Sequence, residues 1–333
     1  MSYFTKGRTS PGKKEIVAQI PPYIFVYNDG TIERPTTYPR TSPSLEDPAT
    51  AVSSKDILFS KNPFLFARLY LPKLTQPDHK IPILVYLHGG GFCFESAFSS
   101  HHFKYCNIFA SMANVLIVAV EHRKAPEHFL PTAYNDCWAG LSWVASHATP
   151  INPTNSDTWL MSHGDFSKVF IGGDSSGGNL VHNIAMRAGV ESLPGGVKVY
   201  GAYLNHPYLW GSKPIGSEPV IGFEECNQSL VWNFAYPDAP GGLDNPMINP
   251  LALGAPSLAT LGCSKMLITV AGKDQLKFRD RAVLYYEAVK DSGWKGEVKL
   301  FEEEQEDHVY FMYDMETEQA KRLIKIVVDF LTQ

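Results

Sequence analysis

Several features that mark common functional classes are scarce or missing in this 333-residue chain. It has five cysteines, an odd number, and no two of them stand in a CxxC spacing. Neither a disulfide framework nor a zinc site is therefore expected. No run of 18 or more apolar residues occurs, so we expect no membrane span. The net charge of −5 argues against a nucleic-acid binder, which would usually be basic.

Targeting signals are also missing from both ends of the sequence. The first residues read MSYFTKGRTSPGKKE and contain no apolar core of a secretory signal. The last residues read FLTQ and match neither a retention signal nor a peroxisomal address. We therefore expect a cytosolic protein. No pattern in the sequence indicates an oligomeric state.

From about residue 64 the sequence alternates between strand-like and helix-like segments. The expected strands are residues 64–72, 81–89, 114–123, 168–175, 199–207, 265–274 and 297–303. The expected helices are residues 98–112, 132–147, 179–189, 279–292 and 317–332. This order predicts an α/β fold, with a mostly parallel central sheet covered by helices on both faces. We expect one domain over residues 1–333.

Two stretches depart from this alternation. Residues 29–50 are rich in Pro, Thr and Ser and are typical of an irregular surface segment. Residues 208–255 contain many Pro, Gly and aromatic residues with little regular periodicity. Such an insertion is expected on loops at the carboxyl ends of the strands, where ligands bind in open α/β sheets.

The segment around Ser175 has the pattern of a nucleophilic serine. It reads Gly-Asp-Ser-Ser-Gly, the form GxSxG, and it lies between an expected strand and an expected helix. That context defines the nucleophile elbow, in which small residues permit a tight turn and the serine side chain projects from the top of the sheet. A GxSxG pattern alone is weak, because small residues are common in such turns, but the flanking elements favour the catalytic interpretation.

The loop after the expected strand 81–87 reads His-Gly-Gly-Gly-Phe. Successive glycines let backbone amides point at a ligand, as in the oxyanion hole of the HGGG type. We expect the donors to be the amides of Gly90 and Gly91, joined by that of Ser176. The alternative is a flexible glycine loop without a catalytic role. This alternative is disfavoured because the serine motif follows later in the chain, in the order that an α/β hydrolase requires.

The chain order Ser, Asp, His directs the search for the partners of Ser175. Asp274 ends one expected strand, and His308 follows the next. Serine needs an adjacent base, and an imidazole suits that role near neutral pH. A carboxylate then fixes the tautomer of the imidazole and stabilises its charged form. We predict that His308 is the base and Asp274 the orienting acid.

Other residues compete for these roles. His206, which follows a strand, is the best alternative base, whereas His182 is expected in the core and His88 is expected to shape the glycine loop. Asp280 is expected at a helix start, where a carboxylate meets the dipole. Arg123 could bind an acidic group or form an ion pair that holds a loop. For Asp136 we expect a structural role, and for Glu306 and Asp307 simple solvation.

With these motifs the chain resembles the plant carboxylesterase family, in the hormone-sensitive-lipase-like group of α/β hydrolases. The resemblance runs from about residue 20 to the end and includes HGGGFCFESAF, GDSSGGNLVHN and EDHVYFMYDMETEQAK. Some passages, such as GSKPIGSE and GAPSLATLGCSK, look most like 2-hydroxyisoflavanone dehydratases. Others, such as AYPDAPGG and NPMINP, resemble the alkaloid-forming cyclases and decarboxylating esterases of the family.

Departures from these subgroups help to choose a function. Gibberellin receptors share the fold but lack the histidine that stands here as His308. The legume dehydratases often carry Thr for the serine and HGGA for HGGG, and the alkaloid cyclases tend to show HGAG. This chain has Ser175, HGGG and His308 together, which favours a carboxylesterase. Dehydration of a 2-hydroxyisoflavanone and decarboxylation or cyclisation of an alkaloid intermediate remain alternatives, and a hormone receptor is disfavoured.

The resemblance also implies a cap over the site, built from residues 1–50 and 208–255. Aromatic residues there would form a pocket for a bulky, ring-containing plant metabolite. The candidate walls are Phe92, Trp210, Trp232 and Tyr310, although aromatics in such a region are more often core residues. The expected partner is a small-molecule substrate, with no nucleic acid and no membrane, and we expect no metal and no organic cofactor.

Overall fold

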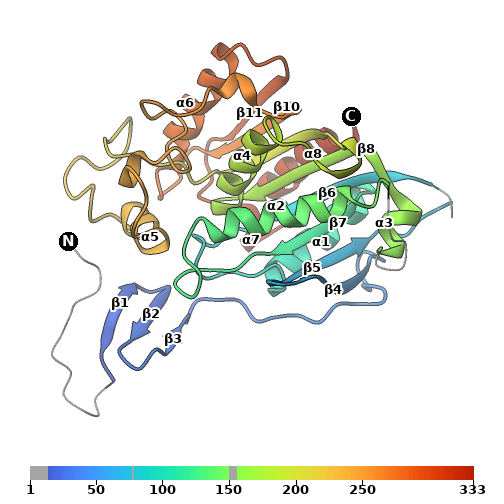
Figure 1. The fold of residues 1–333 in the computed structure, drawn as a ribbon, viewed down its shortest axis with the longest axis horizontal. Helices are drawn as coiled ribbons and strands as arrows, with labels where there is room; N and C mark the ends of the chain where they lie inside the picture. The colour runs from blue at the N-terminus through green and yellow to red at the C-terminus, as the bar shows by residue number, and fades with distance from the viewer. Residues whose placement is uncertain (1–13, 77–78, 150–155) are drawn as a thin grey trace.

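The fold was described from a computed structural model that covers residues 14–76, 79–149 and 156–333. Figure 1 shows a twisted central sheet with helices on both of its faces. The expected N-terminal segment 1–50 is thus described from residue 14 onward, and its first 13 residues lie outside the described ranges. None of the helices in these ranges is long and apolar enough to cross a bilayer.

The central sheet has eight strands in the order β11-β10-β9-β8-β6-β7-β5-β4. Only β5 runs antiparallel to its two neighbours, so the sheet is mostly parallel, as predicted. The strands are β4 (Ser53–Lys61), β5 (Phe64–Leu71), β6 (Ile81–Leu87), β7 (Leu116–Glu121), β8 (Gly164–Asp174), β9 (Val199–Asn205), β10 (Cys263–Ala271) and β11 (Glu297–Glu303).

Two apolar clusters, one on each face of the sheet, form the core. Along β6 the side chains of Ile83 and Val85 join one cluster, and those of Leu84 and Tyr86 join the other. This alternation follows from the two-residue period of a strand, and it explains why the buried strands are almost continuously apolar. The first cluster is covered by α2 (Thr132–Ala145), α4 (Ser176–Ala188) and α6 (Phe278–Asp291). The second is covered by α1 (Ser100–Ala113), α7 (Tyr310–Tyr313) and α8 (Glu318–Thr332).

A second, smaller sheet lies at one end of the molecule. It is antiparallel, in the order β1-β2-β3, and β1 contacts α5 of the 208–255 insertion (Figure 1). The remaining elements are β1 (Ile16–Ile20), β2 (Ile24–Tyr27), β3 (Ile32–Glu33), α3 (Thr158–His163) and α5 (Asn227–Ala235). The N-terminal segment and the insertion are therefore neighbours in space although they are distant in the sequence.

The sequence pattern did not indicate several of these elements. The segment SSKDILFSK forms the edge strand β4, in which Asp56 and Lys61 are exposed and only Ser54 is buried, so the strand shows no apolar alternation. β1, β2 and β3 are short, and the helix α5 lies in the insertion that we expected to be irregular. All the strands and helices expected from residue 64 onward, outside that insertion, are present within a few residues of their expected bounds.

Candidate active site

Ser175 lies at the turn between β8 and α4. Its φ of 53° and ψ of −119° place a non-glycine residue in a strained conformation, and its amide donates to the carbonyl of Asn205 at 2.8 Å. A Cβ atom on Gly173 or Gly177 would overlap the carbonyl oxygen of Leu87. The turn therefore needs glycine on both sides of the serine, because the neighbouring strand passes too close for any side chain.

Three side chains from separate parts of the chain form a hydrogen-bonded series. His308 Nε2 lies 2.9 Å from Ser175 Oγ, and His308 Nδ1 lies 3.0 Å from Asp274 Oδ2. Each residue follows the carboxyl end of a strand: β8, β10 or β11. Because these strands run parallel, their carboxyl ends meet at the same edge of the sheet. Such a series can deprotonate a hydroxyl and stabilise the resulting imidazolium.

The electrostatic surroundings keep Asp274 ionised. Burial opposes its negative charge, but the charge of His308, their hydrogen bond and the amide of Leu276 together lower the pKa of Asp274 below its ordinary value. The side chain of Asp274 is almost completely buried, while that of His308 is 10 % exposed. A buried carboxylate beside a slightly exposed imidazole is the arrangement needed to hold a base in one orientation.

The alternative base, His206, does not contact Ser175. Its Nδ1 accepts from the amide of Val309 at 2.9 Å, and its ring lies 5.7 Å from that of His308. Burial, with a contribution from the charge of His308, lowers the pKa of His206 to about 3. His206 therefore stays neutral and supports the backbone next to His308.

The other competing side chains have structural partners. Asp280 lies in the first turn of α6 and accepts from the amide of Ser217 at 2.7 Å. Arg123 pairs with Asp136 at 2.7 Å, as an ion pair that holds the loop after β7. Asp307 is not simply solvated, because it accepts from the amide of Gln275 at 2.8 Å.

The glycine loop passes close to Ser175. Gly90 and Gly91 have φ of 105° and 55°, which glycine adopts freely, and both residues line the cavity that contains Ser175. The amide of Phe92 donates to Ser176 Oγ at 3.3 Å, which joins the loop to the start of α4. Within the described residues, the amides of Gly90, Gly91 and Ser176 donate to no protein acceptor.

The cavity over Ser175 is enclosed by both segments that we expected to form a cap. Tyr23, Thr36 and Tyr38 line it from the N-terminal segment. Tyr208, Asn227, Gln228 and Val231 line it from the insertion. The other aromatic walls are Phe94, Phe278 and Tyr313, together with His101 and His102. The cavity is therefore lined by rings on several sides, which suits a flat or ring-containing ligand.

The predicted pocket walls were wrong in detail. Phe92, Trp210 and Trp232 are almost completely buried and belong to the core beneath the insertion, so they do not line the cavity. Their rings contact other rings instead, such as Phe223 stacked on Trp210 at 5.1 Å. Tyr310 borders an adjoining pocket on the other side of His308. Large aromatics in an irregular segment filled the core because they bury the most apolar area.

The true walls carried little signal in the sequence. Tyr23 and Tyr38 lie in a segment without periodicity, and Tyr313 is the last residue of the short helix α7 after His308. Phe94 and Glu95 could have been found, because both follow the glycine loop directly and must lie near whatever the loop binds. In the described parts of the chain, no three His, Cys, Asp or Glu side chains are arranged to hold a metal ion.

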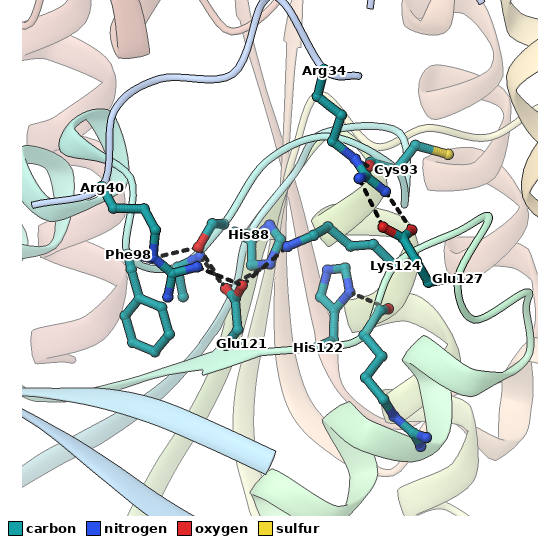
Figure 2. Close-up of polar contacts among 12 residues, drawn as sticks. Arg34, Arg40, His88, Cys93, Phe98, Glu121, His122, Lys124 and Glu127 are labelled. Atoms are coloured by element: carbon teal, nitrogen blue, oxygen red, sulfur yellow. Dashed lines mark hydrogen bonds and ion pairs between the residues drawn. The ribbon is translucent and has the colours of Figure 1, made fainter. Parts of the chain in front are cut away.

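Two anchors hold the glycine loop in place (Figure 2). Arg34, from the N-terminal segment, donates to the carbonyl of Cys93 at 2.6 Å and pairs with Glu127 at 2.5 Å. Glu121, at the end of β7, accepts from the amide of Ala97 at 2.7 Å and lies 3.0 Å from Lys124 Nζ. The residues that follow the three glycines are therefore fixed by charge-assisted bonds from two other segments.

Replacing Arg34 with alanine is expected to lower the free energy of unfolding by about 1–3 kcal/mol, because two carbonyls and a carboxylate lose a charged donor. Lys14→Ala is the matched control, since its ion pair with Glu33 is exposed and should add nothing measurable. Urea denaturation of both variants measures the difference. Equal stability of the two variants would show that Arg34 does not anchor the loop.

Residues 84–312 match the family described as alpha/beta hydrolase fold. The chain is 58 % identical to a 2-hydroxyisoflavanone dehydratase of Glycyrrhiza echinata, covering 96 % of this chain and 97 % of that one. It is 38 % identical to probable carboxylesterase 2 of Arabidopsis thaliana, covering 96 % and 98 %. The esterase LipW of Mycobacterium marinum shares the fold, with a TM-score of 0.67 and 24 % identity over 85 % of this chain and 82 % of that one.

Proposed function

The chain belongs to the alpha/beta hydrolase fold family, and from this membership we propose that it is a serine carboxylesterase of a bulky, ring-containing plant metabolite. The observation that carries the proposal is the hydrogen-bonded series of Ser175, His308 and Asp274. This series provides a nucleophile, a base and an orienting acid in one place. Its location in a ring-lined cavity supports a small organic substrate rather than a polymer.

The proposed reaction passes through an acyl-enzyme. Ser175 Oγ attacks the ester carbonyl while His308 Nε2 takes its proton, and His308 then gives that proton to the leaving alcohol. Water, activated by His308, cleaves the acyl-enzyme along the same route. Asp274 holds the imidazole in the tautomer that this sequence of proton transfers requires.

The negative oxygen formed in each step needs donors. We assign this role to the amides of Gly90, Gly91 and Ser176, which have no protein acceptor in the described chain. Each such donor lowers the activation barrier by about 2.7–4 kcal/mol. The start of α4 adds the positive end of its dipole at the same point.

Residues 14–50 and 208–255 both supply walls to the cavity, and we propose that together they are the cap. The contact of β1 with α5 supports this, because it joins the two segments above the sheet. The ring-lined walls then select a substrate with aromatic or fused rings. A cytosolic location remains a prediction of the sequence.

Hydrolysis of 4-nitrophenyl acetate by the intact protein tests the proposal. We expect a burst of 4-nitrophenol close to one equivalent per enzyme chain, followed by a slower steady rate, because deacylation follows a faster acylation. Stopped-flow absorbance measures both phases. Saturable binding of ring compounds without any ester turnover would favour a receptor and contradict the esterase proposal.

A second function is favoured by one specific observation, the 58 % identity to a 2-hydroxyisoflavanone dehydratase. On the same site, His308 would remove the proton from C3 of a 2-hydroxyisoflavanone while the C2–OH bond breaks, and the resulting imidazolium would give that proton to the departing hydroxide, which leaves as water. The glycine amides would stabilise charge on the adjacent carbonyl oxygen. Conversion of a 2-hydroxyisoflavanone to the isoflavone, followed by its absorbance, distinguishes this reaction from ester cleavage.

A further inference from the structure

Glu95 is an acidic side chain in the cavity that the proposed reaction does not use. It lies four residues after Gly91, and a Cβ atom on Gly90 would come within 2.5 Å of Glu95 Cβ. Its Oε2 atom is buried and makes no hydrogen bond within the described chain. The other lining carboxylate, Asp174, is already engaged, because it accepts from the hydroxyl of Tyr86. Glu95 therefore offers the cavity an acceptor next to the glycine loop.

Rings from three other segments line the same cavity as this acceptor. The rings of Tyr38 and His101 are tilted against each other with centroids 3.4 Å apart, and His101 meets Tyr313 edge-on at 6.2 Å. The charge of Glu95 contributes to raising the pKa of both Tyr38 and Tyr313, although burial is the larger cause. The two phenols are therefore close enough to sense the carboxyl group. We call Glu95, Tyr38, His101 and Tyr313 the Glu95 subsite.

The protein itself supplies no positive charge to this subsite. The described lining of the cavity contains neither lysine nor arginine. Burial, together with His102 and Lys104, lowers the pKa of His101, so its ring is neutral near pH 7. Burial raises the pKa of Glu95 to about 7, and the charge of Asp174 adds to this, whereas the Ser99 hydroxyl and the backbone of Tyr38 and Ser96 oppose it. Glu95 is thus not fully ionised at that pH, its Oε2 atom has no donor within the described chain, and no lysine or arginine of the cavity lining pairs with it.

We propose that Glu95 is a substrate-binding residue that accepts a hydrogen bond from a hydroxyl or ammonium group of a ring-containing ester. This inference rests on the proposed esterase function and adds its specificity. An unsatisfied buried acceptor such as Glu95 Oε2 costs free energy. A ligand that donates a hydrogen bond to it recovers that free energy and therefore binds more tightly. Two carboxyl groups with neither lysine nor arginine in the described lining disfavour substrates that carry a carboxylate near this end.

The position of Glu95 explains how its hydrogen bond to the substrate would orient the substrate. Glu95 packs on Gly90, one of the proposed oxyanion donors, so a ligand group bound at Glu95 has a fixed direction relative to Ser175. A ring of the substrate would then lie among Tyr38, His101 and Tyr313. A substrate ammonium would also form cation–π interactions with the faces of these rings, whereas a hydroxyl would form only the hydrogen bond to Glu95.

Four matched esters test the proposal. They are 4-nitrophenyl 3-arylpropanoates whose aryl group carries para-hydroxyl, para-methoxy, para-aminomethyl or para-ethyl. In the wild type we expect kcat/KM for the hydroxyl ester to exceed that for the methoxy ester by about tenfold. If the site binds a cation, kcat/KM for the aminomethyl ester should exceed that for the neutral ethyl ester by a similar factor. Ratios within one enzyme cancel any general change in activity.

Two variants assign these preferences to Glu95. Glu95→Gln keeps an acceptor but no charge, so it should retain the hydroxyl preference and lose the ammonium preference. Glu95→Leu should bring both ratios close to one. A hydroxyl preference shared by the wild type and the glutamine variant identifies a hydroxyl ligand, and an ammonium preference lost in the glutamine variant identifies an amine. Ratios that are equal in all three proteins overturn the subsite.

Binding measurements separate this inference from the esterase proposal. Ketones that carry the same four aryl groups and have no cleavable ester are titrated into the intact wild type and both variants by calorimetry. If the wild type cleaves no ester but its dissociation constants show the Glu95-dependent ratios, the subsite stands and the esterase function fails. If esters are cleaved without those ratios in kinetics or binding, the subsite fails alone.

The pH dependence of stability gives a readout without any ligand. A raised pKa in the folded state means that Glu95 supports folding below its ordinary pKa near 4.5 and loses that contribution as pH rises through about 7. The Tm of Glu95→Gln relative to the wild type should therefore rise between pH 5 and pH 8. The Asp174 carboxyl, His101, Tyr38 and Tyr313 are present in both proteins, so their contributions to Tm cancel in the difference. A constant difference would show that burial does not raise the pKa of this carboxyl group.

Discussion

Replacing Ser175 with alanine is expected to lower kcat for 4-nitrophenyl acetate by about 10⁶-fold, the scale found when a serine nucleophile is removed from such a series. The physical reason is that the variant lacks the hydroxyl that lies 2.9 Å from His308 Nε2 in the wild type, so the protein has no nucleophile for His308 to deprotonate. The donors around the carbonyl would remain, so a small residual rate above that of water should persist. Steady-state kinetics at saturating ester measures the loss.

The matched control is Ser167→Ala. Ser167 lies on the same strand, β8, but it is exposed and bonds only to nearby Asp165. We expect this variant to keep kcat within about twofold, because surface substitutions of this kind change little. A Ser175→Ala protein that is folded by circular dichroism and retains a tenth of the wild-type kcat would contradict the role of Ser175 as nucleophile.

The central sheet was predictable because its strands are buried on both faces. Segments such as residues 81–87 and 116–121 are almost wholly apolar and are bounded by glycine or by charged residues, which leaves few alternatives to a parallel sheet. The strand β4 escaped because it lies at the edge, where solvent accepts Lys55 and Asp56 as readily as an apolar residue. Apolar periodicity therefore predicts only those strands and helices whose side chains pack in the core.

The candidate site was predictable for a different reason. The glycines around Ser175 and in the loop at 89–91 are demanded by close backbone contacts, and the sequence therefore reveals them. The positions of Asp274 and His308 follow from strand order, because parallel strands bring their ends to one edge. The sequence placed these residues in the order that an α/β hydrolase requires, and the structure places them within hydrogen-bond distance.

The cavity walls could not be predicted, because a wall is set by packing between distant segments. Trp210 and Trp232 are as aromatic as Tyr38 and Tyr313, yet only the last two line the cavity. The difference arises because α5 packs its large rings inward, whereas the N-terminal segment reaches across the site from the other side. Local composition does not encode which side of a segment faces the ligand.

His308→Ala is expected to abolish both reactions considered for this site, whereas Ser175→Ala should abolish only ester cleavage. Ester hydrolysis should fall in His308→Ala by about as much as in Ser175→Ala, and the double variant should be no worse, because the residues act as a unit. Dehydration of a 2-hydroxyisoflavanone needs a base but no covalent bond to the protein. Loss of the base should therefore cost about 10²–10⁴-fold in that reaction.

The split between the two variants decides between the functions. Isoflavone formation that survives in Ser175→Ala but not in His308→Ala would mean that the imidazole acts directly on the substrate carbon. Isoflavone formation in neither the wild type nor the variants, with ester cleavage intact, would leave the hydrolytic role alone. His206→Gln is the structural control, since His206 supports the backbone at Val309 without contacting Ser175. If it lost activity as severely as His308→Ala, the assignment of the base to His308 would be contradicted.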